Sequence, residues 1–252
     1  MKHKISVFIV IISALICAFV APNTSIRNEW LLLIGLGFFF VLSAGVLFMR
    51  MNYFVKSISR IQKPAILLTF DDGPHPENTP KILAVLKEHN CKALFFLIGS
   101  KAQQFPDLVE QIQREGHLIG NHTQHHSPFF AMMSRKKVKD EVLSGQQTLE
   151  QLCNKKINLF RPPVGITNPK IADVINQLNL KSISWNKRSF DTVFKTPQRL
   201  VRRLQFLAKP GSIILLHDNL NVTADALPVF MEKSAQKNLE FVNESTINSF
   251  FQ

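Results

Sequence analysis

Two long apolar runs without a charged residue open the chain, and they constrain its fold more than any other feature. The first covers residues 5–26 and the second residues 30–49. At about 1.5 Å of rise per residue, each run is long enough as a helix to cross a hydrocarbon core about 30 Å thick. Lys2 and Lys4 before an apolar stretch are also typical of a cleaved signal peptide, and this alternative stays open. The pattern favours a helical hairpin in a membrane.

The positive charges beside these runs predict the orientation of the hairpin. Arg27, next to Glu29, is the single cation in the connection between the runs. Four cations follow the second run: Arg50, Lys56, Arg60 and Lys63. Because cytoplasmic flanks carry the excess of Lys and Arg, the rest of the chain is expected on the cytoplasmic side, most simply of a bacterial inner membrane. Residues 22–29 are then expected outside.

The charge and the cysteines exclude several classes of protein. A net charge of +12 favours anionic partners, meaning phospholipid headgroups, phosphorylated sugars or nucleic acid. Lys and Arg are scattered, and there is no RNA-binding signature, zinc-finger spacing or glycine-rich phosphate loop, so no nucleic acid partner is expected. The three cysteines are isolated and indicate neither a disulfide framework nor a thiolate metal site.

From about residue 63 the chain alternates between short apolar runs and amphipathic segments. We therefore expect a membrane anchor with a basic linker over residues 1–62 and a catalytic domain over residues 63–252. Strands are predicted at 65–70, 93–98, 118–120, 158–160, 181–185 and 212–216, with helices between them. Strict alternation predicts parallel strands in an α/β sheet or barrel, whose chemistry sits at the carboxyl ends of the strands.

Two adjacent acids, Asp71 and Asp72, follow the first predicted strand in the segment Thr-Phe-Asp-Asp-Gly-Pro at 69–74. Neighbouring carboxylates repel each other unless a cation or a proton separates their roles. A metal ion would bind one Asp and leave the other free as a base. Asp-Gly-Pro is also ordinary turn chemistry, and this segment alone supports the two interpretations about equally.

Three histidines lie close together after the third predicted strand, in Gly-Asn-His-Thr-Gln-His-His-Ser at 120–127. His122 and His126 are four residues apart, so on one helical turn both rings would face the same way and share a metal ion. His122 with His125 is a usable alternative. A lone histidine is more often packed or solvated, but this cluster favours a metal site. Two His and one Asp leave open positions, as a catalytic metal site requires.

The segment Phe-Arg-Pro-Pro-Val-Gly at 160–165 follows the fourth predicted strand. Arg161 could hold a carboxylate through two nitrogens, which keeps the carboxylate ionised and oriented. The prolines stiffen the loop, so that the amide of Val164 could be fixed as a donor to an oxyanion. On its own the segment could equally be a rigid surface connection.

The last two polar segments contain Asp191 and, at 215–218, Leu-Leu-His-Asp. His217 follows an apolar strand and is well placed to protonate a leaving amine. Asp191 could accept the other N–H of this histidine and raise its pKa. Taken alone, Asp191 is explained more simply as an acid in a solvated loop. His217 and Asp218 alone could be the hydrogen-bonded end of a strand.

In this order, the five segments closely resemble the five motifs of the polysaccharide deacetylases, the NodB-homology group of carbohydrate esterase family four. The resemblance covers roughly residue 64 to the C-terminus, and its first, second and fifth motifs are specific. It implies a distorted (β/α) barrel of about seven parallel strands, here preceded by two transmembrane helices. The implied activity is hydrolysis of an N-acetyl or other N-acyl group from an amino sugar.

The resemblance also implies the roles of the catalytic residues. Asp71 would be the general base and His217 the general acid. Arg161 would orient Asp71, and Asp191 would tune His217.

The metal and the substrate are assigned by the same resemblance. Asp72, His122 and His126 would bind one divalent ion, with Zn²⁺ expected and Co²⁺ or Ni²⁺ as alternatives. The loop at Pro163 and Val164 would contact the substrate and contribute an amide to the oxyanion hole.

Two positions depart from the family pattern. The family commonly has an aromatic residue in place of Val164 and Trp in place of Thr192, and both wall the substrate groove in relatives. A lipid-linked glycan would suit a cytoplasmic domain beside a bilayer better than a chitin-like or peptidoglycan chain, and the positive charge would suit its phosphate. Two alternatives stay open: a deformylase of a lipid-linked aminosugar, and a catalytically silent module that binds a glycan or lipid headgroup.

Overall fold

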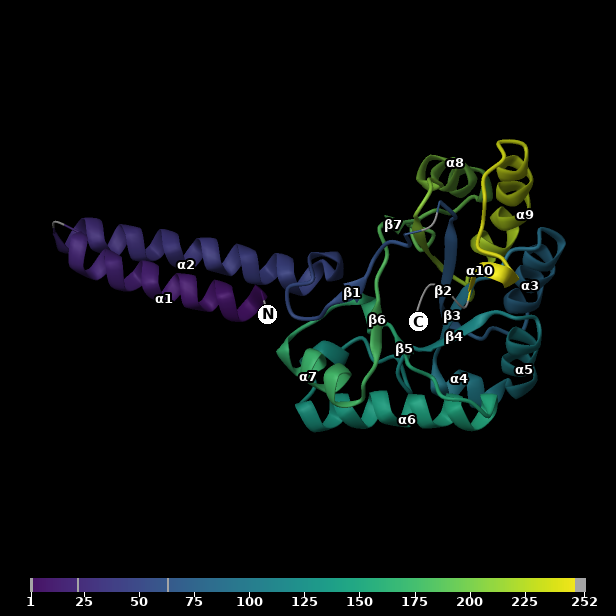
Figure 1. Ribbon diagram of the computed structural model, residues 1–252, viewed down its shortest axis with the longest axis horizontal. Helices are drawn as coiled ribbons and strands as arrows, with labels where there is room; N and C mark the ends of the chain where they lie inside the picture. Colours follow the sequence, from purple (N-terminus) through teal and green to yellow (C-terminus); the bar gives the residue numbers. More distant parts are fainter. Residues whose placement is uncertain (1, 22, 63, 248–252) are drawn as a thin grey trace.

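The computed structural model describes residues 2–21, 23–62 and 64–247 (Figure 1). A helical hairpin projects from one side of an α/β domain, and the two parts meet at the end of the hairpin that carries the N-terminus (Figure 1). Pro22, in the loop expected outside the membrane, and Lys63, at the expected start of the catalytic domain, lie outside the described residues.

The hairpin consists of α1 (Lys2–Val20) and α2 (Thr24–Leu47). The first apolar run was expected to continue to residue 26. Instead, the side chain of Asn23 accepts a hydrogen bond from the Ile26 amide, and this cap begins α2. Both helices are long and apolar enough to cross a membrane, and most of their large apolar side chains are exposed.

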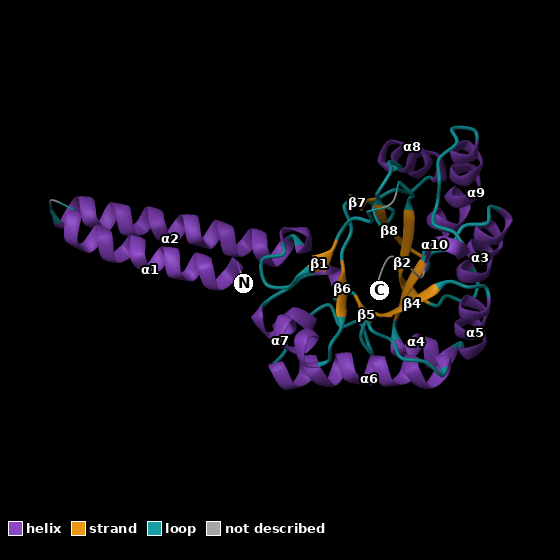
Figure 2. Cartoon of the chain, viewed as in Figure 1, coloured by secondary structure: helices purple, strands orange, loops and turns teal. Residues whose placement is uncertain are grey.

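All strands of the domain are parallel and form one eight-stranded sheet in the order β1-β6-β5-β4-β3-β2-β8-β7. The strands are β1 (Ser57–Ile58), β2 (Leu67–Gly73), β3 (Leu94–Leu97), β4 (Leu118–Asn121), β5 (Leu159–Phe160), β6 (Lys181–Ile183), β7 (Lys187–Arg188) and β8 (Ile213–His217). The six predicted strands are present, and the sheet curls as expected for a distorted barrel (Figure 2).

The two strands that the sequence did not predict, β1 and β7, form the edges of the sheet and leave the barrel open between them. Each has two residues, too short for a periodic pattern to reveal. β1 pairs with β6, so the sheet extends into the segment predicted as a linker.

Helices surround the curled sheet, with α6 along one side and α3, α5, α8 and α9 along the others (Figure 1). The bounds are α3 (Asn78–Glu88), α4 (Gly99–Gln104), α5 (Pro106–Arg114), α6 (Arg135–Cys153), α7 (Pro169–Gln177), α8 (Pro197–Leu207), α9 (Asn221–Ala235) and α10 (Glu244–Ile247). One apolar cluster joins the sheet to α3, α4, α5, α6, α8 and α9, and a separate cluster packs α7 against α6 and β5. A third cluster, which includes Leu67, Phe96 and Ile213, joins strand to strand inside the barrel.

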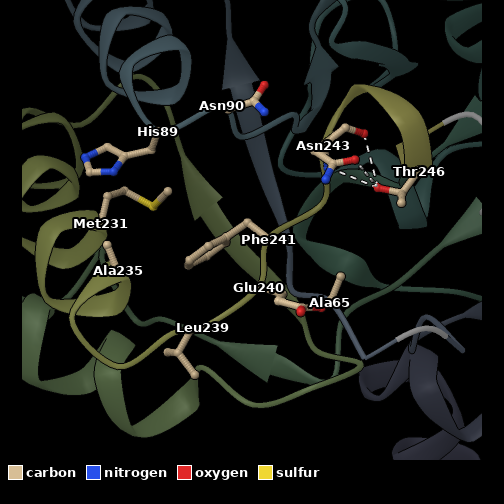
Figure 3. Close-up of a pocket in the computed structure, with 10 residues that line it drawn as sticks. All are labelled: Ala65, His89, Asn90, Met231, Ala235, Leu239, Glu240, Phe241, Asn243 and Thr246. Carbon is tan, nitrogen blue, oxygen red and sulfur yellow. Dashed lines mark hydrogen bonds between the residues drawn. The ribbon is translucent and has the colours of Figure 1, made fainter.

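One cavity lies at the amino-terminal ends of the strands (Figure 3). Ala65, just before β2, and Asn90, just before β3, line it together with Phe241. The polar clusters singled out from the sequence follow the strands instead, so this cavity is at the end of the barrel opposite to them.

Candidate active site

The predicted functional residues converge at the carboxyl ends of the parallel strands. Asp71 lies at the end of β2 and His217 at the end of β8, and the two are register partners on adjacent strands. The histidine loop follows β4, and Arg161 follows β5. Parallel strands place their carboxyl ends at one edge of a barrel, which explains why residues far apart in sequence meet here.

Asp72, His122 and His126 form a compact cluster with the composition of a metal site. Their ligand atoms all lie within 4.8 Å of one another. The Oδ1 atom of Asp72 is 3.5 Å from Nε2 of His122 and 3.3 Å from Nε2 of His126. A carboxylate oxygen and two ring nitrogens therefore face one point.

The histidine loop is not helical, so the helical-turn argument for the pair was wrong, although the same two rings converge. Thr123 and His126 have positive φ angles of 70° and 52°, and the Thr123 hydroxyl accepts a hydrogen bond from the His126 amide. These left-handed residues turn the chain back on itself. The ring centroids of His122 and His126 end 4.7 Å apart.

His125, the alternative partner, is directed away from the cluster. Its Nδ1 is 2.7 Å from a carboxylate oxygen of Glu141, and its backbone amide donates to the same carboxylate. The His125 side chain is mostly exposed. The pair formed by His122 and His125 is therefore not assembled.

The cluster fits a divalent cation. The Nδ1 atom of His122 lies 2.7 Å from the carbonyl of Arg161, so Nδ1–H donates there and leaves Nε2 free as a ligand. Oδ1 of Asp72 is buried with no hydrogen-bond donor in the described part of the chain. Burial raises the pKa of Asp72, but His122 and the other histidines beside it outweigh burial and lower that pKa. An ionised oxygen without a donor is what a cation would satisfy.

Asp71 is held by Arg161 rather than by the cluster. Nη1 of Arg161 lies 2.6 Å from Oδ1 of Asp71, whereas Oδ2 of Asp71 is 3.8 Å from Nε2 of His122. The expected two-nitrogen grip is not formed. The other guanidinium nitrogens donate to the carbonyls of Ile183 and Ser184 on the β6 side of the barrel. Arg161 is fully buried and fixes the carboxylate by one strong contact.

Asp191, which is buried, and His217, which is partly buried, form a second pair. Nδ1 of His217 donates to Oδ1 of Asp191 at 2.9 Å, and Thr223 donates to the other carboxylate oxygen at 2.9 Å. Burial lowers the pKa of His217, but the hydrogen bond and charge of Asp191 outweigh it, and the pKa rises to about 9. The imidazole is therefore held protonated, as a proton donor must be.

Val164 occupies a strained backbone position beside these pairs. Its φ of 60° is left-handed, which is unusual for a β-branched residue. The amides of Gly165 and Ile166 donate to the carbonyls of Pro162 and Pro163, whereas that of Val164 meets no acceptor among the residues described. A free, rigidly held N–H is suited to an oxyanion.

Asp218 and Trp185 were not predicted as site residues. Asp218 is fully buried and accepts a hydrogen bond from Thr79, and burial with the charges of Asp72 and Asp71 raises its pKa to about 7. Its carboxylate fills the space that a side chain at Gly73 would need, which explains the glycine of the first segment. This contact joins the ends of β2 and β8, which are far apart in the sequence, so no local motif predicts it.

Trp185 is an aromatic residue that packs against the loop of Val164. Its ring packs where a Cβ at Gly165 would lie, and its centroid is 5.4 Å from the guanidinium carbon of Arg161. The sequence placed Trp185 at the end of a strand, but β6 ends two residues earlier.

Comparisons with known proteins agree with this geometry. The family model described as polysaccharide deacetylase matches residues 59–183 and begins after both apolar helices, next to β1. The chitooligosaccharide deacetylase of Azorhizobium caulinodans is 39% identical over 155 residues, covering 61% of this chain and 73% of that protein.

Solved structures give the same result. The peptidoglycan deacetylase PdaC from Bacillus subtilis matches with a TM-score of 0.67 and 30% identity, covering 73% of this chain and 89% of that chain. A CE4 family pseudoenzyme from Bacillus anthracis matches with a TM-score of 0.70 and 25% identity, covering 78% and 69%. The fold is thus shared by proteins described as deacetylases and as pseudoenzymes, and the residues in the site must distinguish between them.

Proposed function

This chain belongs to the polysaccharide deacetylase family and is a hydrolase of amide bonds, and from this premise we propose that it removes the N-acetyl group of an amino sugar with the help of a divalent metal ion. One observation carries the proposal: the ligand atoms of Asp72, His122 and His126 converge beside the Asp71 carboxylate, and His217 is the register partner of Asp71. A metal site, a base and an acid therefore adjoin.

A divalent ion held by Asp72, His122 and His126, with Zn²⁺ expected, would act as a Lewis acid and lower the pKa of water. Asp71, fixed by Arg161, accepts the proton of the attacking water.

Negative charge develops on the carbonyl oxygen during the attack. The amide N–H of Val164, which has no other acceptor among the described residues, stabilises this charge by a hydrogen bond. His217 then donates its proton to the departing nitrogen, so that the products are a free amine and a carboxylate. Asp191 keeps His217 oriented and protonated for this step.

Release of acetate tests the proposal. We expect acetate from N-acetylglucosamine oligomers or from a lipid-linked N-acetyl sugar, and loss of this release with a chelator. Formate release from an N-formyl sugar, without acetate from any N-acetyl sugar, would identify a deformylase instead. No release from any amino sugar by metal-loaded protein would contradict the proposal and indicate a silent module, like the pseudoenzyme that shares this fold.

Asp191→Asn is expected to move the alkaline limb of the pH–activity profile to lower pH. His217 must be protonated to donate, so activity should fall as pH rises through its raised pKa of about 9. Loss of the Asp191 charge should lower that pKa by about 1–3 units. Profiles of kcat/KM against pH measure the shift, with Asp225→Asn on the exposed face of α9 as control. An unmoved alkaline limb would show that His217 is not the acid, or that Asp191 does not tune it.

We also propose that the hairpin spans the membrane and that the catalytic domain is cytoplasmic. Single cysteines at Ser25, in the first turn of α2, and at exposed Lys237 test this in a chain whose native cysteines are replaced by Ala. An impermeant thiol reagent should label intact cells at Ser25→Cys only. Labelling at Lys237→Cys alone would place the domain outside the cytoplasm and would favour a cell-wall polymer as the substrate.

A further inference from the structure

A pocket lined by cations lies where the anchor meets the open side of the barrel. α2 and the short helix after it, η1 (Met49–Met51), contribute Leu47 to Arg50. The β6–β7 connection contributes Trp185 and Asn186, and β7 contributes Lys187 and Arg188. Figure 1 shows the hairpin meeting the domain on the side that carries β1 and β7. The Thr167 amide also donates to the Val46 carbonyl at 3.1 Å, which fixes the end of α2 against the domain.

Four positive side chains line this pocket: Arg50, Lys187, Arg188 and Arg203. No Asp or Glu lines it, and none of the four forms an ion pair with an acid in the part of the chain that the structure describes. Like charges gathered without a counterion repel one another, and an anion would relieve that repulsion.

Two of these cations are already positioned. The guanidinium carbons of Arg188 and Arg203 each lie 5.3 Å from the centroid of Phe190, and Arg203 donates to the Arg188 carbonyl at 3.2 Å. Nε of Arg203 is buried and has no acceptor among the described residues. Guanidinium groups held in place with donors to spare are suited to phosphate oxygens.

The pocket adjoins the active site through one side chain. Trp185 lines the pocket, and its ring also lies 5.4 Å from the guanidinium carbon of Arg161, which holds the general base. A cavity of about 340 Å³ lies within the usual range of small-molecule sites, roughly 300–1,000 Å³. The pocket therefore lies beside the segment that holds the general base in place.

We propose that this pocket binds the phosphate through which an amino-sugar substrate is attached to a membrane lipid. The inference rests on the proposed function and names its substrate class. The pocket lies at the foot of α2, where Leu47 and Phe48 are exposed and the proposed span ends. A lipid phosphate lies at this level of a bilayer, whereas a finished polysaccharide carries no such group there.

Fluorescence of Trp185 provides a direct test, because the chain has two tryptophans and Trp30→Phe leaves Trp185 as the single tryptophan, which is excited selectively over tyrosine. The full chain is placed in nanodiscs of phosphatidylcholine, with or without a minor fraction of phosphatidic acid, and inorganic phosphate is titrated separately. We expect phosphatidic acid to change the Trp185 emission, and inorganic phosphate to act only at far higher concentration.

Charge-matched variants separate a built site from general attraction. Arg188→Gln with Arg203→Gln should weaken the response to phosphatidic acid at least about tenfold, because two charged donors are lost. Arg199→Gln with Arg202→Gln removes the same charge from the exposed face of α8 and should leave the response intact. Arg50→Gln removes the pocket cation that the anchor contributes, and it should also weaken the response.

Equal loss in both double variants, or no response to phosphatidic acid, would overturn the inference. An equal response to inorganic phosphate would assign the pocket to a soluble anion and overturn the lipid carrier. Bound metal, measured in each variant, reports that the barrel is folded. A specific phosphatidic acid response in protein that releases no acyl group would support the phosphate site while contradicting the proposed hydrolysis.

Discussion

Asp71→Asn is expected to lower the rate of amide hydrolysis by about 10²–10⁴-fold while the bound metal is retained. Asparagine keeps the shape of the side chain and its contact with Arg161, but it cannot accept a proton at neutral pH. Asp71 also stands apart from the metal cluster, since its Oδ2 is 3.8 Å from Nε2 of His122. The change should therefore remove the base and spare the ligands.

The comparison requires kcat and metal content for each protein on the same preparation. Asp173→Asn is a suitable control, because Asp173 is exposed and forms a surface ion pair with Arg135. Near-normal turnover in Asp71→Asn would contradict the role of base. Loss of metal in that variant would instead make Asp71 a ligand and require a new assignment of both acids.

His126→Ala and Asp72→Asn are each expected to lose the metal and the activity together. Each removes one of three ligands, and a site that must also hold water and substrate has none to spare. Asp72 should be the more sensitive position, because its negative charge is the only one among the three ligands. We expect metal content well below one ion per chain and turnover near background after gel filtration.

His125→Ala is the matched control for this experiment. His125 is one residue from His126, but its ring pairs with Glu141 and faces away from the cluster. It should keep both metal and turnover. If His125→Ala lost the metal and His126→Ala kept it, the cluster described here would not be the working site.

The parts of the site that follow strands could be predicted from the sequence. An apolar run that ends in polar residues marks the carboxyl end of a buried strand, and this located Asp71, His122 and His217 before any contact was known. The roles given to them depend on the family resemblance, because Asp-Gly-Pro alone is as typical of a turn. The histidine pair was chosen by a helical spacing that the loop does not have, and left-handed residues produce the convergence instead.

The rest of the site depends on contacts between distant segments. Gly73 is required by Asp218, which is 145 positions later and directly follows the neighbouring strand β8. Trp185 gains its role only when β6 and the Arg161 loop are side by side. The edge strands β1 and β7 are held by pairing with β6 and β8, not by patterns of their own. Such features have no periodicity or local motif, so sequence reasoning does not detect them.

The placement of the positive charges also depends on contacts between distant segments. The sequence gives a net charge of +12 and predicts an anionic partner. Its arrangement becomes visible only when Arg50 from the anchor meets Arg188 and Arg203 from the barrel in one pocket.

Titration of metal-free protein with Zn²⁺ tests the central claim most directly. Chelator-treated full chain is mixed with increasing Zn²⁺, and acetate release from an N-acetyl amino sugar is measured at each step. We expect no release without metal and a linear rise that ends at one ion per chain, absent in Asp72→Asn. Full acetate release by the metal-free chain, or an unchanged titration in Asp72→Asn, would contradict a catalytic metal held by Asp72, His122 and His126.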